Sequence, residues 1–124
     1  MGRILIIEDD AAIREMLRRR LELRGFAVDQ AVDGEAGLAM IQASPPDAVI
    51  LDHGLPGISG WEVARALRAD PRFATLPIIA LTAHAGLASR REALAAGCTA
   101  FFTKPVDMKA LEKELRVHLG PEHP

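Results

Sequence analysis

The chain has 124 residues, 49 % of them apolar, which is enough to fill the core of one domain of ordinary size. Its 15 basic and 17 acidic side chains leave a formal charge of -2, so we expect no direct binding to nucleic acid or to an anionic membrane. No apolar run is long enough for a signal peptide or a membrane span, and the single cysteine, Cys98, cannot form an internal disulfide. These features predict a cytoplasmic protein in which Cys98 is a small packing residue.

Two hydrophobic periodicities alternate along the chain. Short apolar runs indicate strands, and their continuous apolar character predicts burial on both faces, as in a parallel sheet. Longer stretches with helical spacing, separated by Gly, Pro and Asp, indicate helices. In chain order, the predicted elements are a strand at 4–7, a helix with an apolar stripe over 13–21, a strand at 26–28, a helix at 34–43, a strand at 48–51, a helix at 60–69, a strand at 78–81, a helix at 87–96, a strand at 100–102 and a helix at 107–119.

Boundary residues support the first and the last of these helices. Gly25 is placed to end the first helix, and Asp107 is placed to cap the last one. The Gly and Pro residues of 120–124 do not favour a helix, so we expect a frayed tail there. The sequence therefore predicts a single domain over residues 1–119.

The alternation of five strands and five helices predicts an α/β fold. Right-handed crossovers between parallel strands favour an open, doubly wound sheet with helices on both faces. The flavodoxin-like strand order 2-1-3-4-5 is the common solution at this size. It places functional loops at the carboxyl ends of the strands, near the switch between the first and third strands.

Acidic side chains follow two of the predicted strands. Glu8, Asp9 and Asp10 come directly after the first strand, and Asp52 follows the third. The predicted strand order brings these ends to one edge, where the carboxylates repel one another unless a cation offsets them. Mg2+ is satisfied by one or two carboxylates, several waters and a substrate phosphate. The sequence therefore predicts a magnesium site that receives a phosphate group.

Two further polar residues follow the remaining strands. Thr82 ends the fourth strand with a hydroxyl that can donate to a phosphate oxygen, and Lys104 follows the fifth with a mobile positive charge. Taken singly, each has an ordinary structural explanation, since Thr is common in strands and most lysines are solvated. Their joint placement with the acids on four strand ends favours a functional site.

Four stretches of the chain resemble a known family. They are ILIIEDD, DAVILDHGLPGISGWE, PIIALTAHA and AAGCTAFFTKP, in the order and spacing of the receiver domains of two-component response regulators, including the chemotaxis regulators. The resemblance covers essentially the whole chain. It implies a signalling domain rather than an enzyme, with Mg2+-dependent self-phosphorylation and self-dephosphorylation. The implied phosphodonor is phosphohistidine on a sensor histidine kinase or a histidine phosphotransfer protein.

The resemblance also assigns roles to the acidic residues. It implies that Asp52 is the phosphoacceptor, and that Asp9 and Asp52 bind Mg2+ directly. Glu8 is expected to act mainly through a metal-bound water, and the Gly54 carbonyl is expected to complete the metal site.

The remaining implied roles concern the response to phosphorylation. Thr82 is expected to contact the phosphoryl group, and Lys104 to form an ion pair with it. Pro105 matches a Lys-Pro step whose peptide is typically cis. Phe101 falls at the switch aromatic, which moves inward with the Thr and changes the partner-binding face formed by the fourth helix, the fifth strand and the fifth helix.

The chain departs from the family pattern at a few positions beside the expected site. His53 and His84 are most simply surface loop residues, although both should flank the phosphoryl pocket. Gly54 lacks the larger side chain found in many relatives. We interpret Arg18–Arg20 as a solvated helix face and Trp61 as a packing residue.

Two other functions remain open from the residues. A Mg2+-dependent aspartyl-phosphate hydrolase would usually carry a second acid two residues after its nucleophile, where this chain has Gly54. A flavin or dinucleotide carrier would need a phosphate-binding loop rich in Gly, Ser or Thr after the first strand, where this chain has acids. The sequence names neither the cognate kinase nor the output partner, and it leaves a phosphorylation-dependent dimer open.

Overall fold

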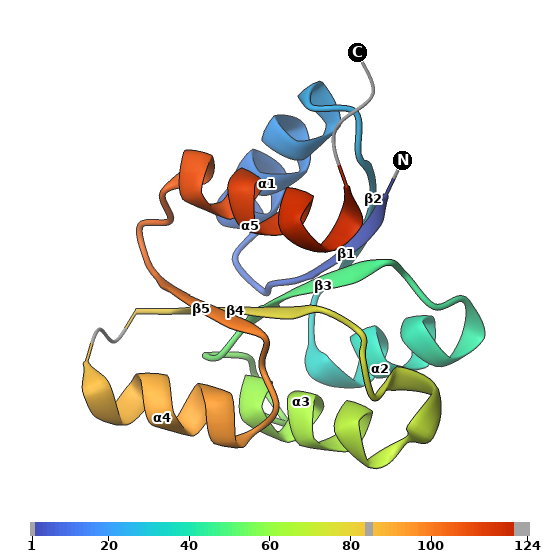
Figure 1. The fold of residues 1–124 in the computed structure, drawn as a ribbon, viewed down its shortest axis with the longest axis vertical. Helices are drawn as coiled ribbons and strands as arrows, with labels where there is room; N and C mark the ends of the chain where they lie inside the picture. The colour runs from blue at the N-terminus through green and yellow to red at the C-terminus, as the bar shows by residue number, and fades with distance from the viewer. Residues whose placement is uncertain (1, 84–85, 121–124) are drawn as a thin grey trace.

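The computed structural model describes residues 2–83 and 86–120, which form five strands, five α-helices and one 3-10 helix (Figure 1). In chain order these are β1 (Arg3–Ile7), α1 (Ala11–Leu23), β2 (Ala27–Ala31), α2 (Gly34–Ala43), β3 (Ala48–Asp52), α3 (Gly60–Ala69), η1 (Pro71–Phe73), β4 (Ile78–Thr82), α4 (Leu87–Ala95), β5 (Ala100–Thr103) and α5 (Met108–Leu119). Every predicted element is present. Gly2 precedes β1, and Gly120 follows α5.

The strands form one parallel sheet in the order β2-β1-β3-β4-β5, as predicted. Helices α1 and α5 cover one face of the sheet, and α2, α3 and α4 cover the other (Figure 1). The pairing of Ile7 with Leu51 and of Asp52 with Leu81 brings the carboxyl ends of β1, β3 and β4 to the same edge. The flavodoxin-like fold is therefore confirmed, and its switch point lies where the acidic residues leave the sheet.

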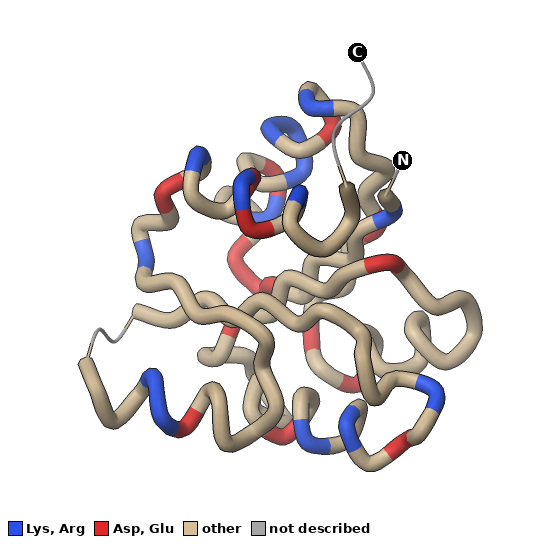
Figure 2. The backbone as a smooth tube through the Cα atoms, viewed as in Figure 1, with Lys and Arg blue, Asp and Glu red and all other residues tan. Residues whose placement is uncertain are grey.

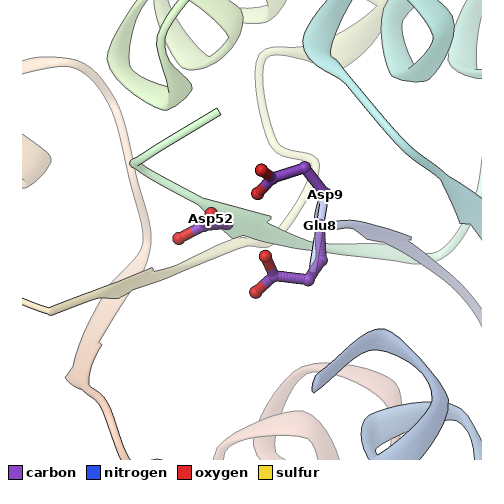
Figure 3. A group of neighbouring side chains, drawn as sticks. All are labelled: Glu8, Asp9 and Asp52. Carbon is purple, nitrogen blue, oxygen red and sulfur yellow. The ribbon is translucent and has the colours of Figure 1, made fainter. Parts of the chain in front are cut away.

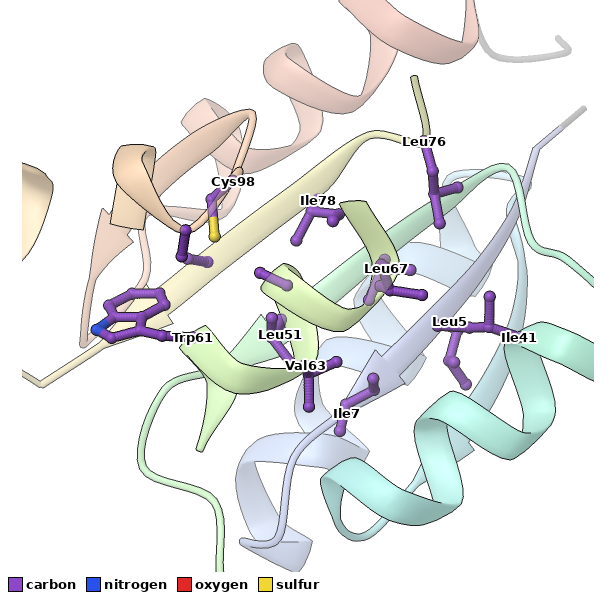
Figure 4. Packing of buried hydrophobic residues seen from close by; sticks show 14 of the residues in the cluster. Leu5, Ile7, Ile41, Leu51, Trp61, Val63, Leu67, Leu76, Ile78 and Cys98 are labelled. Carbon is purple, nitrogen blue, oxygen red and sulfur yellow. The ribbon is translucent and has the colours of Figure 1, made fainter. Parts of the chain in front are cut away.

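Two apolar clusters, one on each face, bury the central strands. The cluster beneath α2, α3 and α4 is the larger, and Figure 4 shows Leu5, Leu51 and Ile78 of the sheet meeting Val63 and Leu67 of α3. The other cluster joins alternate residues of the same strands to α1 and α5. Strands β3 and β4 are buried at all five positions, which is the pattern expected of a central parallel strand.

The prediction that every strand is buried on both faces is wrong for β2 and β5. All four residues of β5 are partly exposed, and in β2 only Ala31 is buried. The reason is their position, because both are edge strands that are flanked on one side only. Phe26, predicted to lie in the second strand, is buried but precedes β2, and α4 ends one residue earlier than predicted.

The helix boundaries follow the expected capping chemistry. Asp107 caps α5, accepting hydrogen bonds from the backbone N–H groups of Lys109 and Ala110. Gly25, with φ of 93°, follows the C-cap of α1 in the left-handed region that favours glycine. Residues 121–124 of the predicted frayed tail lie outside the described residues. Among the described residues, no helix has both the length and the apolar content needed to cross a membrane.

Candidate functional site

Three carboxylates converge where β1 and β3 end. Oxygen atoms of Glu8, Asp9 and Asp52 all lie within 4.8 Å of one another, and Figure 3 shows the three side chains turned toward the same space. Glu8 is 1 % exposed and Asp52 is 4 % exposed, whereas Asp9 is exposed. Buried carboxylates at this separation repel each other strongly unless positive charge lies beside them. Their oxygen donors are the ligands preferred by a hard divalent cation.

Asp10, the third acid after β1, caps helix α1. Its Oδ1 accepts hydrogen bonds from the backbone N–H groups of Ala12 and Ile13, at 2.9 and 3.0 Å, so it is the N-cap of α1. Asp10 lines the same cavity as the other acids, but the cap turns its carboxylate toward the helix. This explains why three of the four neighbouring acids, rather than all four, form the compact cluster.

Lys104 supplies positive charge to the cluster from the end of β5. Its Nζ lies 3.0 Å from Glu8 Oε1 and 2.9 Å from Asp52 Oδ1. Its backbone N–H donates to the Thr82 carbonyl at 2.7 Å, and its peptide bond to Pro105 is cis, as expected. One ammonium group therefore bridges carboxylates from two different strands.

The ionisation of the cluster reflects its burial. Desolvation raises the pKa of Glu8 from 4.5 to about 7, despite the opposing hydrogen bonds from Lys104 and from the backbone of Asp10. Burial lowers the pKa of Lys104, but its hydrogen bonds to Asp52 and Glu8 outweigh that effect and raise the pKa above its ordinary value. The site thus holds a permanent cation beside an acid that is only partly ionised near neutral pH.

A cavity of about 410 Å3 opens above these groups. Thr82, at the end of β4 and 1 % exposed, lines it together with the three carboxylates and Lys104. Gly54 also lines the cavity, and a Cβ atom placed on it would meet only Asp52 Oδ2, at 3.8 Å. The space beside the Asp52 carboxylate is therefore open on the Gly54 side. His84, the other expected flanking residue, lies outside the described residues.

The segment after Asp52 is held by contacts that no motif in the sequence indicates. The His53 ring stacks on the Trp61 ring, with centroids 4.1 Å apart and an interplanar angle of 18°. The His53 backbone N–H donates to the Leu81 carbonyl at 2.9 Å, and its carbonyl accepts from the Gly60 N–H at 3.2 Å. His53 is thus a packed residue and not a free surface histidine, while the packing role expected for Trp61 is confirmed by its burial.

Gly60 allows the start of α3 to approach the end of β3. A Cβ atom placed on it would lie 2.6 Å from the Asp52 carbonyl oxygen and 2.8 Å from the Cα of His53. The backbone cannot yield as a flexible side chain would, so position 60 accepts only glycine at this separation. The contact joins positions eight residues apart, and no motif in the sequence indicates it.

The structure also gives the burial and contacts of three residues outside the cavity for which the sequence predicted a role. Phe101 is half-buried and packs against the cluster beneath α2, α3 and α4. Cys98 is buried, and desolvation raises the pKa of its thiol to about 11, which agrees with a packing role. In the basic run of α1, Arg18 pairs with Glu15 and Glu22 on the same helix.

Comparison with known proteins shows which protein family the chain is similar to. Residues 4–116 match the response regulator receiver domain. The chain is 38 % identical over 119 residues to the DNA-binding dual master transcriptional regulator RpaA of Synechocystis sp., which covers 96 % of this chain and 49 % of that protein. It is 40 % identical over 117 residues to the response regulator MprA of Mycolicibacterium vanbaalenii, which covers 94 % and 50 %. The chain therefore spans about half the length of these curated relatives.

Solved structures agree with the sequence matches. A response regulator from Chloroflexus aurantiacus superposes with a TM-score of 0.91 at 34 % identity, covering 95 % of this chain and 97 % of that one. The chemotaxis protein CheY4 of Vibrio cholerae superposes with a TM-score of 0.89 at 31 % identity, covering 96 % and 99 %.

Proposed function

Because the chain belongs to the family of response regulator receiver domains, we propose that it is a phosphoacceptor switch in which Asp52 carries the phosphoryl group. The observation that carries this proposal is the meeting of Asp52 with two acids and Lys104 at the mouth of one cavity. Glu8 and Asp52 both contact the lysine, but Asp52 alone of the three acids belongs to a strand, the central strand β3, and faces the two acids that follow β1. The proposed donor is phosphohistidine on a sensor histidine kinase or a histidine phosphotransfer protein.

The donor set fits a magnesium ion. The exposed Asp9 carboxylate and the Asp52 carboxylate would bind Mg2+ directly, and the Gly54 carbonyl would add a third oxygen. Glu8, whose Oε1 is already held by Lys104, would act through a bound water. When bound, the ion supplies positive charge that offsets the carboxylates and the phosphoryl oxygens.

The chain's own residues account for the transfer step. An Asp52 carboxylate oxygen attacks phosphorus in line, so that a P–O bond forms while the P–N bond of the phosphohistidine breaks, and the imidazole leaves neutral with the proton that its other ring nitrogen already carries. Lys104, 2.9 Å from Asp52 Oδ1, is placed to stabilise the transferred oxygens. The Thr82 hydroxyl would donate to one of them from the end of the neighbouring strand β4. Positioning and fixed charge carry such a reaction.

The added charge provides the signal. A phosphoryl group on Asp52 draws Thr82 and Lys104 toward it, which loosens the bridge from Lys104 to Glu8. The half-buried Phe101 lies one strand from Thr82 and moves inward as the end of β4 shifts. The consequence is a changed surface on α4, β5 and α5, which an output partner or a second copy of the chain recognises in the cytoplasm.

The alternative, an aspartyl-phosphate hydrolase, usually carries its general acid two residues after the nucleophile, where this chain has Gly54. Position 54, two residues after Asp52, carries no side chain, and the space beside it is open. A site of this kind retains its phosphoryl group until a water reaches it, which suits a switch better than a turnover enzyme.

Intact-mass analysis tests the proposed acceptor. The protein incubated with Mg2+ and acetyl phosphate should gain the mass of one phosphoryl group, and Asp52→Asn should gain none. Asp10→Asn is the matched control, because Asp10 is a neighbouring acid already engaged as a helix cap. Unchanged labelling of Asp52→Asn would refute the assignment.

A further inference from the structure

We infer that Arg14 is a positioning residue for the acidic cluster, acting through the backbone of the β1–α1 turn; the inference rests on the proposed function. Arg14 lies in the first turn of α1, and its guanidinium donates to the Glu8 carbonyl at 2.8 Å and to the Asp9 carbonyl at 3.4 Å. These are the carbonyls of the two residues whose side chains form the β1 half of the cluster. Arg14 touches neither carboxylate in these contacts and therefore acts through the peptide groups.

The peptide between Asp9 and Asp10 links Arg14 to the Glu8 carboxylate. Its carbonyl accepts from Arg14, while its N–H, on Asp10, donates to Glu8 Oε2 at 3.2 Å. A peptide group held by a cation at its oxygen and an anion at its hydrogen is polarised and fixed in orientation. Rotation of this peptide would break both contacts together.

The same network continues to the acceptor. Glu8 Oε1 binds Lys104 Nζ at 3.0 Å, and Lys104 Nζ binds Asp52 Oδ1 at 2.9 Å. Arg14 is thus the far end of a chain of contacts that runs through one peptide, one carboxylate and one ammonium to Asp52. Figure 2 shows where these charges lie, with acidic residues concentrated in the turn from β1 to α1 and basic residues along α1.

One effect of Arg14 on the cluster follows from this geometry. It fixes the turn, so that Glu8 and Asp9 present their carboxylates on the Asp52 side. Groups that orient metal ligands through such contacts typically change metal affinity by about 10-fold to 100-fold when removed.

Calorimetric titration with Mg2+ tests the inference on the full chain. Arg14→Ala should raise the Mg2+ Kd about tenfold. At saturating Mg2+, the rate of Asp52 labelling by acetyl phosphate should recover to nearly the wild-type value, because Arg14 contacts no reacting atom. Arg14→Lys should restore part of the affinity, since one ammonium can still reach the Glu8 carbonyl. Arg19→Ala removes the same charge from an exposed position of α1 and should leave the Kd almost unchanged.

A metal-free measurement separates this inference from the proposed function. In the presence of a chelator, the amide proton resonance of Asp10 should move upfield in Arg14→Ala and stay in place in Arg19→Ala. Only the first substitution removes the hydrogen bond that polarises the peptide between Asp9 and Asp10. Equal Mg2+ affinities of Arg14→Ala and Arg19→Ala, or an unmoved Asp10 amide, would overturn the positioning role. Failure of the wild-type protein to bind Mg2+ or accept phosphate, with the Asp10 amide shifted as expected, would instead overturn the proposed function alone.

Discussion

Replacing Glu8 with Gln should stabilise the metal-free protein at pH 8. Glu8 is 1 % exposed, and desolvation raises its pKa from 4.5 to about 7. The folded chain therefore binds more protons than the unfolded chain between these two pH values, so the free energy of unfolding falls as pH rises from 4.5 to 7. The loss of stability is complete above pH 7, where Glu8 must be ionised in its buried position.

The size of this change in the free energy of unfolding follows from the rise in the pKa of Glu8. One pKa unit corresponds to about 1.4 kcal/mol, so ionised Glu8 costs on the order of 3 kcal/mol relative to a neutral group of the same shape. Glutamine is a neutral group of nearly the same shape, and its carbonyl can still accept from Lys104, but its NH2 group then faces the Asp10 N–H and loses that hydrogen bond, at a cost of about 1 kcal/mol. Glu8→Gln should therefore raise the free energy of unfolding at pH 8 by about 2 kcal/mol and lower it by about 1 kcal/mol at pH 4.5.

Urea unfolding in the presence of a chelator, measured from pH 4.5 to 8, gives the free energy of unfolding of the wild type and of Glu8→Gln at each pH. Glu92→Gln removes the same charge from an exposed position of α4 and should reproduce the wild-type pH profile. Saturating Mg2+ should reduce the advantage of Glu8→Gln, because the ion favours the ionised carboxylate. A wild-type profile that is flat between pH 4.5 and 7, or a Glu8→Gln variant less stable than wild type at pH 8, would refute the reasoning.

Three further outcomes are expected. Asp9→Ala should weaken Mg2+ binding more than Glu8→Ala in calorimetry, because we assign Asp9 a direct metal bond; equal losses would contradict that assignment. Lys104→Ala should keep a native circular dichroism spectrum yet abolish the NMR shifts at Phe101 on phosphorylation, and wild-type shifts would count against its role. Gly60→Ala should lower the free energy of unfolding by about 1–3 kcal/mol in urea, since its Cβ would lie 2.6 Å from a backbone oxygen; unchanged stability would show that α3 can shift.

The fold was predictable because its determinants are local and periodic. The apolar runs that form β1, β3 and β4 are continuous, and parallel order follows from the alternation with helices. The meeting of Glu8 and Asp52 follows in turn, since residues at the carboxyl ends of adjacent parallel strands share one edge. The exposure of β2 and β5 was missed, although the predicted order 2-1-3-4-5 puts both at the edges of the sheet, because burial on both faces was inferred from the short apolar runs alone.

Contacts that depend on how separate elements meet were not predictable from the sequence. The stack of His53 on Trp61 joins a loop to the first turn of α3, and no periodicity marks such a pair. The bond from Arg14 to the Glu8 carbonyl requires the exact path of the turn into α1, since an arginine in a first helical turn ordinarily points to solvent. Side-chain hydrogen bonds to distant carbonyls leave no signature in residue type or spacing.

The lifetime of the phosphorylated state should depend on Gly54. A water that hydrolyses the aspartyl phosphate must reach phosphorus in line, and the open space beside Asp52 lies on the Gly54 side. A Cβ atom at position 54 would make only an ordinary contact, 3.8 Å from Asp52 Oδ2, so a side chain can start there without a clash at Cβ. Gly54→Leu should therefore slow hydrolysis by about tenfold, equivalent to ~1.4 kcal/mol in the barrier, while Gly54→Ala should have a smaller effect.

Decay of the purified phosphoprotein, followed by intact mass at saturating Mg2+, measures these rates. The free energy of unfolding of both variants should match that of wild type, which separates obstruction of water from damage to the fold. Saturating Mg2+ is essential, because the Gly54 carbonyl is a proposed ligand and a change in metal affinity would otherwise alter the rate. Hydrolysis that is equally fast in Gly54→Leu would mean that water approaches from another side of the cavity, and faster hydrolysis would mean that the new side chain orients the water instead of excluding it.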